Sequence, residues 1–127
     1  MTTSVLDASA VLAHGHGEEG AEVVDEYLDG AAISTVNWSE ILRRSGERGV
    51  QGPELRAALR DAGVTFVPFV ESDAETAARF WESTRRLGLS LADRACLALA
   101  DRLGVPAVTA DRAWTLLDLG VDVVCIR

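Results

Sequence analysis

Short runs of β-branched and apolar residues alternate along this chain with longer stretches of helical periodicity. Strands that alternate with helices pair in parallel and are joined by right-handed crossovers. We therefore expect an α/β fold of three layers, in which a mostly parallel central sheet of about five strands is flanked by helices. The predicted strands are Ser4–Asp7, Ala31–Ser34, Val64–Phe69, Ala107–Thr109 and Val121–Ile126. The predicted helices are Ala8–His14, Glu18–Asp29, Thr35–Glu47, Pro53–Asp61, Asp73–Leu87, Leu91–Leu103 and Trp114–Leu119.

Two of these helices carry informative apolar patterns. In Asp73–Leu87, small and aromatic residues recur at i, i+3, i+4 and i+7, which predicts a buried stripe. The stripe consists of Ala74, Ala77, Ala78 and Trp81. In Leu91–Leu103, residues 95–100 are apolar nearly all round, so we expect that helix to be largely buried.

Length and composition fit a single domain spanning residues 1–127. Apolar residues make up 48% of the chain and charged residues 25%, as in soluble globular proteins. Cys96 and Cys125 have no neighbouring cysteine or histidine at ligand spacing. No apolar run approaches the roughly 20 residues of a membrane-spanning helix, and the first residues do not resemble a secretory signal. We therefore expect a cytoplasmic protein that has no membrane partner.

The net charge is −8, from 20 acidic and 12 basic residues, and every basic residue is arginine. Field-driven nucleic-acid binding relies on net positive charge, so this balance argues against it. The objection loses force if part of the negative charge belongs to a metal site, because bound metal neutralises it.

Four acidic residues from separate predicted elements are candidates for such a site. Asp7 ends the first strand and Asp111 follows the fourth, and ligands of open parallel sheets bind at the carboxyl ends of the strands. Asp93 lies in the first turn of the Leu91–Leu103 helix, and Glu40 lies within the helix after the second strand. Carboxylate oxygens suit Mg²⁺ and Mn²⁺, and two such ions can stabilise the attacking and the leaving oxygen of a phosphodiester.

Each acid also has a purely structural interpretation. Asp7 and Asp111 fit the N-caps of the helices that follow them. Asp93 completes a capping box with Ser90. Glu40 stands four residues before Arg44, the spacing of a surface ion pair.

Four sequence blocks carry these acids: Val5–Ala10, Asn37–Glu40, Gly88–Asp93 and Thr109–Trp114. In order and spacing, and over the whole chain, they are similar to those of the PIN-domain ribonucleases, specifically the VapC-type toxins. The resemblance implies a PIN-like fold and a Mg²⁺- or Mn²⁺-dependent endoribonuclease that cuts RNA. It also implies a cognate antitoxin protein as partner and a homodimer. The chain departs from the family at His14–Gly17, where relatives are more apolar.

The resemblance also implies roles for particular residues. The family's metal-binding and catalytic acids correspond to Asp7, Glu40, Asp93 and Asp111, and its hydroxyl groups near the metal correspond to Ser9 and Thr109. Arginines near these acids are candidates for contacts with RNA phosphates. They are Arg43, Arg44, Arg94 and Arg112. Solvated helix faces that balance nearby acids are an equally good interpretation of each arginine.

Other motifs and functions fit less well. Gly15–Gly20 matches GxGxxG in spacing, but Glu18 and Glu19 would repel a pyrophosphate, and a predicted helix separates the motif from the strand. A phosphatase of the haloacid-dehalogenase type or a phospho-receiver domain would place a lysine near the phosphoryl group, and this chain has none. RNA processing, DNA cleavage and a non-catalytic binding module of the same fold remain alternatives.

Overall fold

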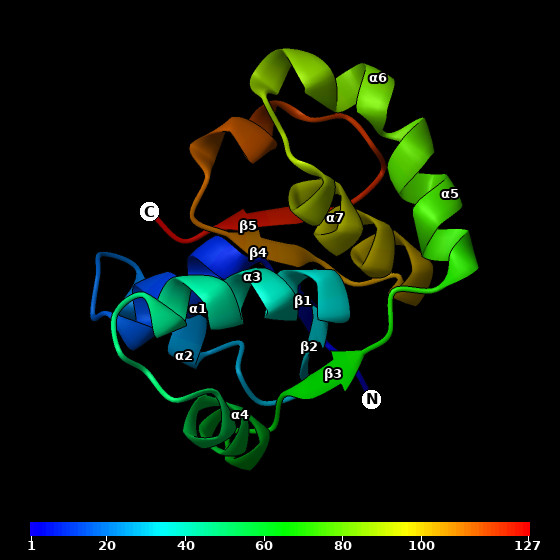
Figure 1. Cartoon of the computed structure of the whole chain (residues 1–127). Coiled ribbons are helices and arrows are strands. Elements are labelled where there is room, and N and C mark those ends of the chain that lie inside the picture. Colours follow the sequence, from blue (N-terminus) through cyan, green and yellow to red (C-terminus); the bar gives the residue numbers. More distant parts are fainter.

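The central sheet has five parallel strands in the order β3-β2-β1-β4-β5 (Figure 1). The strands are β1 (Ser4–Leu6), β2 (Ala31–Ser34), β3 (Thr65–Val67), β4 (Ala107–Thr109) and β5 (Val123–Cys125). Val5 of β1 pairs with Ala32 on one side and Ala107 on the other, so the first strand lies in the middle of the sheet. The structure, a computed structural model, describes residues 1–127. It confirms the predicted three-layer α/β fold.

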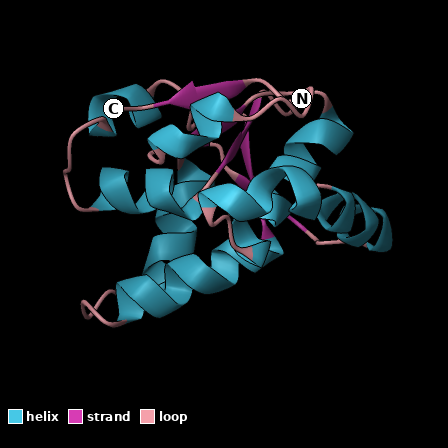
Figure 2. Ribbon diagram, turned by 90° about the horizontal axis from the view of Figure 1, so that it is seen from above, coloured by secondary structure: helices cyan, strands magenta, loops and turns pink.

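Helices cover both faces of the sheet (Figure 2). The α-helices are α1 (Ala8–Gly15), α2 (Ala21–Asp25), α3 (Thr35–Gly46), α4 (Gly52–Asp61), α5 (Glu71–Arg79), α6 (Trp81–Thr84) and α7 (Leu91–Leu103). Two 3₁₀ helices complete the fold, η1 (Arg85–Leu87) and η2 (Arg112–Leu116). None of these helices combines the length and the apolar character needed to cross a lipid bilayer.

Alternate residues of the central strands contribute to two separate hydrophobic cores. Val5 and its neighbours Ala32 and Ala107 pack with the buried residues of α7 on one face. Leu6 and Val108 pack with α1 and α2 on the other face. Both faces of a strand are buried in a sheet that is covered on both sides, as is usual for parallel sheets. As predicted, residues 95–100 of α7 are buried.

The predicted helix over residues 73–87 is wrong in extent and in most of its buried face. The segment divides into α5, α6 and η1, and Trp81 is 48% exposed. Ala74 and Ala78 are exposed as well, whereas Ala77 is buried as predicted and Asp73 is also buried. Asp73 is inside because Arg102 of α7 donates two hydrogen bonds to its carboxylate, at 2.7 and 3.0 Å. An apolar pattern cannot reveal a buried face that is built around an ion pair.

Two other predicted helices are shorter than expected. The segment predicted over residues 18–29 contains only α2, and the one over residues 114–119 is replaced by η2. Gly20 precedes α2 with a φ of 94°, and a Cβ there would lie 2.7 Å from the carbonyl oxygen of Ile126. Only glycine tolerates both this conformation and this approach, so α2 begins after it. The predicted strands at residues 64–69 and 121–126 shorten to β3 and β5.

Candidate metal centre

Asp7 lies at the carboxyl end of β1, where the chain turns into α1. It is 3% exposed, and its carboxylate caps α1 by accepting from the Ser9 amide at 3.4 Å. The Ser9 hydroxyl donates to the same oxygen, Oδ2, at 2.5 Å, and the Thr109 hydroxyl donates to it at 3.1 Å. Residues from the ends of β1 and β4 therefore meet at one carboxylate oxygen.

The hydroxyl groups of Ser9 and Thr109 are themselves fixed by the backbone after β4. Ser9 Oγ accepts from the amide of Ala110 at 2.9 Å, and Thr109 Oγ1 accepts from the amide of Asp111 at 3.1 Å. Each hydroxyl group has one hydrogen to donate. Since both hydroxyl oxygens accept from backbone amides, that hydrogen remains available for the bond to Asp7. The arrangement fixes the Asp7 side chain and positions the start of the segment that carries Asp111.

The other three acids approach from separate elements, each held by a structural contact. Glu40 on α3 accepts from Arg44 at 3.4 Å. Asp93 in the first turn of α7 accepts from the Ser90 amide at 2.9 Å and completes the predicted capping box. Asp111 caps η2 by accepting from the Ala113 amide at 3.0 Å. The caps, the capping box and the ion pair predicted for the four acids are therefore all present in the structure.

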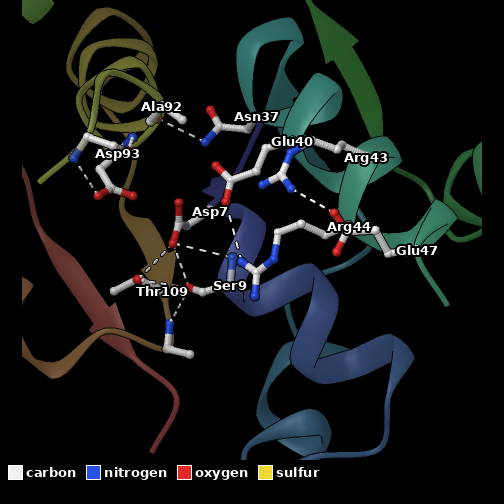
Figure 3. Close-up of polar contacts among 12 residues, drawn as sticks. Asp7, Ser9, Asn37, Glu40, Arg43, Arg44, Glu47, Ala92, Asp93 and Thr109 are labelled. Atoms are coloured by element: carbon white, nitrogen blue, oxygen red, sulfur yellow. Dashed lines mark hydrogen bonds and ion pairs between the residues drawn. The ribbon is translucent and has the colours of Figure 1, made fainter.

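In each of the four acids, these contacts use only one carboxylate oxygen. Oδ2 of Asp7, Oε2 of Glu40, Oδ2 of Asp93 and Oδ1 of Asp111 accept hydrogen bonds, whereas the second oxygen of each takes none. Figure 3 shows the Asp7, Glu40 and Asp93 carboxylates turned toward a common space between α3 and α7. Capping and ligand binding are thus compatible in the same side chains.

Electrostatic coupling joins the acids. Burial raises the pKa of Asp7 to about 7, and the charges of Asp93 and Glu40 add to the rise while the Ser9 and Thr109 hydroxyls oppose it. Burial also raises the pKa of Asp93, with contributions from Glu40 and Asp111. Like charges close together disfavour ionisation of one another, so this cluster favours a bound cation.

The donor set of the cluster fits a hard divalent cation. It consists only of carboxylate oxygens, the ligands that Mg²⁺ and Mn²⁺ prefer. No three histidine, cysteine, aspartate or glutamate side chains stand close enough to ligate one ion as they are placed. Glu40 is paired with Arg44, and Asp93 and Asp111 are anchored by their caps, so ligation by three acids requires side-chain movement.

Asn37 is a further residue of this region. It belongs to the block Asn37–Glu40 but was not among the predicted site residues. It is fully buried on α3, one turn before Glu40, and its amide donates to the carbonyl of Ala92 on α7 at 3.0 Å. Its Oδ1 is enclosed and has no partner. The signal available in the sequence was its spacing, because Asn37 stands three residues before Glu40 and therefore on the same side of the predicted helix.

The four candidate arginines are placed differently from one another. Arg44 lies beside Glu40, and Arg43 pairs with Glu47 at 2.9 Å (Figure 3). Arg94 is directed away from the acids, because its guanidinium donates to the carbonyl of Ala77 on α5 at 2.9 Å. Arg112 is exposed and forms no ion pair.

The sequence model of the PIN domain family matches residues 4–118 of this chain. No curated protein matches it in sequence. A toxin–antitoxin complex from Klebsiella pneumoniae contains a chain that is 18% identical, with a TM-score of 0.80 over 98% of both chains. A DNA-bound VapBC complex from Salmonella typhimurium contains one that is 16% identical, with a TM-score of 0.70 over 100% of both.

A third solved structure is VapC20 from Mycobacterium tuberculosis, described as a toxin that cleaves the sarcin-ricin loop. It is 13% identical, with a TM-score of 0.73, and the match covers 90% of this chain and 94% of that one. At such identities these likenesses establish the fold, and function has to be argued from the site.

Proposed function

This chain belongs to the PIN domain family, and from that premise we propose that it is a divalent-metal-dependent endoribonuclease, the toxin of a toxin–antitoxin pair. The relatives with solved structures that are described as toxins, or as parts of toxin–antitoxin complexes, support the biological role. The carboxylate cluster supports the chemistry.

The free oxygen of Asp7 is the observation that carries the chemical part of the proposal. Asp7 is almost completely buried, yet its Oδ1 takes no hydrogen bond and is not among the enclosed unpartnered atoms. Each oxygen of a buried carboxylate normally has a hydrogen-bond partner, because burying an unpaired charge is costly. An open oxygen facing Glu40 and Asp93 is what a metal ligand requires.

Asp7, Glu40, Asp93 and Asp111 would hold the metal. When bound, a divalent cation supplies Lewis-acid stabilisation of the charged phosphoryl oxygens and lowers the pKa of water. Ser9 and Thr109 hold Asp7 in one orientation, so its free oxygen needs no reorganisation. Arg44, beside Glu40, can donate to a phosphate oxygen once a ligand draws Glu40 away.

The proposed partner is a cognate antitoxin with a basic segment. The chain carries a net charge of −8, and four of its acids gather at one edge of the sheet. An arginine inserted among these acids would satisfy the free carboxylate oxygens and exclude the metal. An antitoxin that bound an Asp93→Ala protein as tightly as the wild type would contradict insertion at this site.

We propose a homodimer as the working form. Trp81, Leu91 and Leu116 are 48%, 53% and 75% exposed, so these large apolar side chains are available to pack against a second copy of the chain. Sedimentation at several protein concentrations tests this, and a concentration-independent monomer would contradict it.

The test of the enzymatic proposal is cleavage of total cellular RNA by the purified protein, with Mg²⁺, with Mn²⁺ and with EDTA, followed by mapping of the new ends. We expect cleavage that requires metal and that Asp7→Asn abolishes, because asparagine keeps the volume of the side chain and removes its charge. Asp101→Asn on the exposed face of α7 is the matched control and should cleave normally. Cleavage by Asp7→Asn at the wild-type rate would overturn the site assignment.

The same experiment separates the alternatives. Metal chemistry does not require a 2′-hydroxyl, so single- and double-stranded DNA of matched sequence belong in the assay. Cutting of DNA but not RNA would make the chain a DNA nuclease, and binding without cutting would make it a non-catalytic module.

A further inference from the structure

A polar pocket of about 210 Å³ opens beside the carboxylate cluster. Its wall is formed by α1, the loop after α1, the C-terminal half of α3 and Arg127, and only one of its eight lining residues is hydrophobic. Ser9 belongs to this wall, and its hydroxyl donates to Asp7. The pocket and the cluster are therefore contiguous.

The pocket is locally positive within an acidic protein. Arg44, Arg48 and Arg127 line it together with two acids, Glu18 and Glu47. Both acids are paired with an arginine, and two of the three lining arginines are engaged as well, because Arg127 pairs with Glu18 and Arg44 pairs with Glu40. Glu18 pairs with Arg127 at 3.1 Å, and Glu47 pairs at 2.9 Å with Arg43, which is not part of the lining. Arg48 forms no ion pair, so its guanidinium is available to a ligand.

Two of these arginines connect the pocket to the cluster. Arg44 lies one turn after Glu40 on α3 and pairs with it at 3.4 Å, and it lines the pocket together with Arg48, which follows the end of the helix. One turn of helix advances roughly 6 Å. A chain of phosphates that has one member at the acids would therefore pass Arg44 and reach the part of the pocket lined by Arg48.

Resting on the proposed nuclease function, we propose that this pocket binds a backbone phosphate next to the scissile bond of RNA, with Arg48 as its principal contact. Guanidinium groups match phosphate oxygens in bidentate geometry, and all three cations of the pocket are arginines. The basic segment expected of an antitoxin fits the acids but is repelled by Arg44 and Arg48. The occupant of the pocket is therefore an anion of the substrate.

The test measures binding separately from cleavage. In the Asp7→Asn background with Mg²⁺, a fluorescent single-stranded RNA is titrated by anisotropy at several KCl concentrations. We expect Arg48→Ala to weaken binding roughly tenfold, as for loss of a hydrogen bond to a charged group. The slope of log K against log[KCl] should fall by about 0.7, the value for one phosphate of a single strand. Arg48→Lys should restore the slope but only part of the affinity.

Arg56→Ala on α4 is the matched control, because Arg56 is also exposed and unpaired but lies outside the pocket. If Arg48→Ala and Arg56→Ala bind alike, or if no RNA binds, the pocket is not a phosphate site, whatever the wild type cleaves. If RNA binds with the Arg48-dependent slope but the wild type cleaves nothing, the phosphate site stands and the nuclease proposal fails.

Discussion

The side-chain amide of Asn37 donates to the carbonyl of Ala92 at 3.0 Å, and this is the only hydrogen bond between α3 and α7. The two helices carry Glu40 and Asp93, each within one turn of this bond. The Oδ1 of Asn37 is buried without a partner, which makes asparagine an expensive choice at this position. An apolar residue of similar size would avoid that cost but would lose the link between the helices.

We therefore predict that Asn37→Leu separates stability from metal binding. Its melting temperature without metal should stay within a few degrees of wild type or rise, because a buried unsatisfied group is removed. Its Kd for Mn²⁺ should increase several-fold, because the helices that carry Glu40 and Asp93 are no longer held together by this hydrogen bond. Calorimetric Mn²⁺ titration and thermal melts measure both. Ser45→Ala, which also alters a buried polar residue of α3, should leave the Kd unchanged; an equal effect in both would show general loosening of the helix.

The hydroxyl of Thr109 supports the second prediction. It donates to Asp7 and accepts from the Asp111 amide, so Thr109→Val leaves a buried carboxylate and a backbone donor each short of one partner. We expect a loss of about 1–3 kcal/mol in the free energy of unfolding and a clear fall in RNA cleavage. Thr84→Val is the control, since Thr84 is equally buried but bonds only to carbonyls of the α5–α6 segment. Thr84→Val should lower the free energy of unfolding but leave RNA cleavage unchanged. If both variants retain the wild-type cleavage rate, the Thr109 hydroxyl has no part in the site.

The third prediction concerns the pH dependence of stability in EDTA. The pKa of Asp7 is about 7 in the folded protein against an ordinary value of 3.8, so between these values the folded state binds more protons than the unfolded state. The free energy of unfolding therefore decreases as pH rises from about 4 to about 7, by a few kcal/mol from this group. Burial raises the pKa of Asp93 and acts in the same direction.

Denaturant unfolding of wild type and Asp7→Asn at pH 5 and pH 8 measures this effect. Wild type should lose more stability than Asp7→Asn between the two values, and the variant should be the more stable protein at pH 8. Equal pH dependence in the two proteins would mean that burial and the neighbouring acids do not raise the pKa of Asp7.

Local sequence patterns explain why much of the fold was predictable. Ala31–Ser34, Ala107–Thr109 and Leu91–Leu103 were predicted with the observed bounds, because each has a continuous apolar pattern and the helix has a capping box and a terminal glycine. The rule that ligands lie at the carboxyl ends of parallel strands likewise placed Asp7 and Asp111 at one edge of the sheet.

Long-range contacts explain what was missed. The buried face of α5 depends on Arg102, which lies 29 residues from Asp73. Arg94 follows a candidate acid in sequence, yet its guanidinium is bonded to α5, because neighbours along a helix point in different directions. Asn37 likewise acts across 55 residues. The catalytic and metal-binding roles of the four acids stay predictions.

The last prediction distinguishes a cap from a ligand at Asp111. Asp111 caps η2 through Oδ1 and leaves Oδ2 free, while its charge contributes to the raised pKa of Asp93. Asparagine caps a helix about as well as aspartate, so Asp111→Asn preserves the cap and removes only the charge. Without metal, the variant should therefore melt at or above the wild-type temperature, because repulsion within the cluster is reduced. Wild type should gain about 2.7 kcal/mol when Mn²⁺ exceeds its Kd a hundredfold, if one ion binds only the folded state. The variant should gain less at the same Mn²⁺ concentration. A melting series on both proteins, with EDTA and with Mn²⁺, measures each quantity. If the two proteins melt alike and neither responds to Mn²⁺, Asp111 is only a cap and the acids do not form a metal centre.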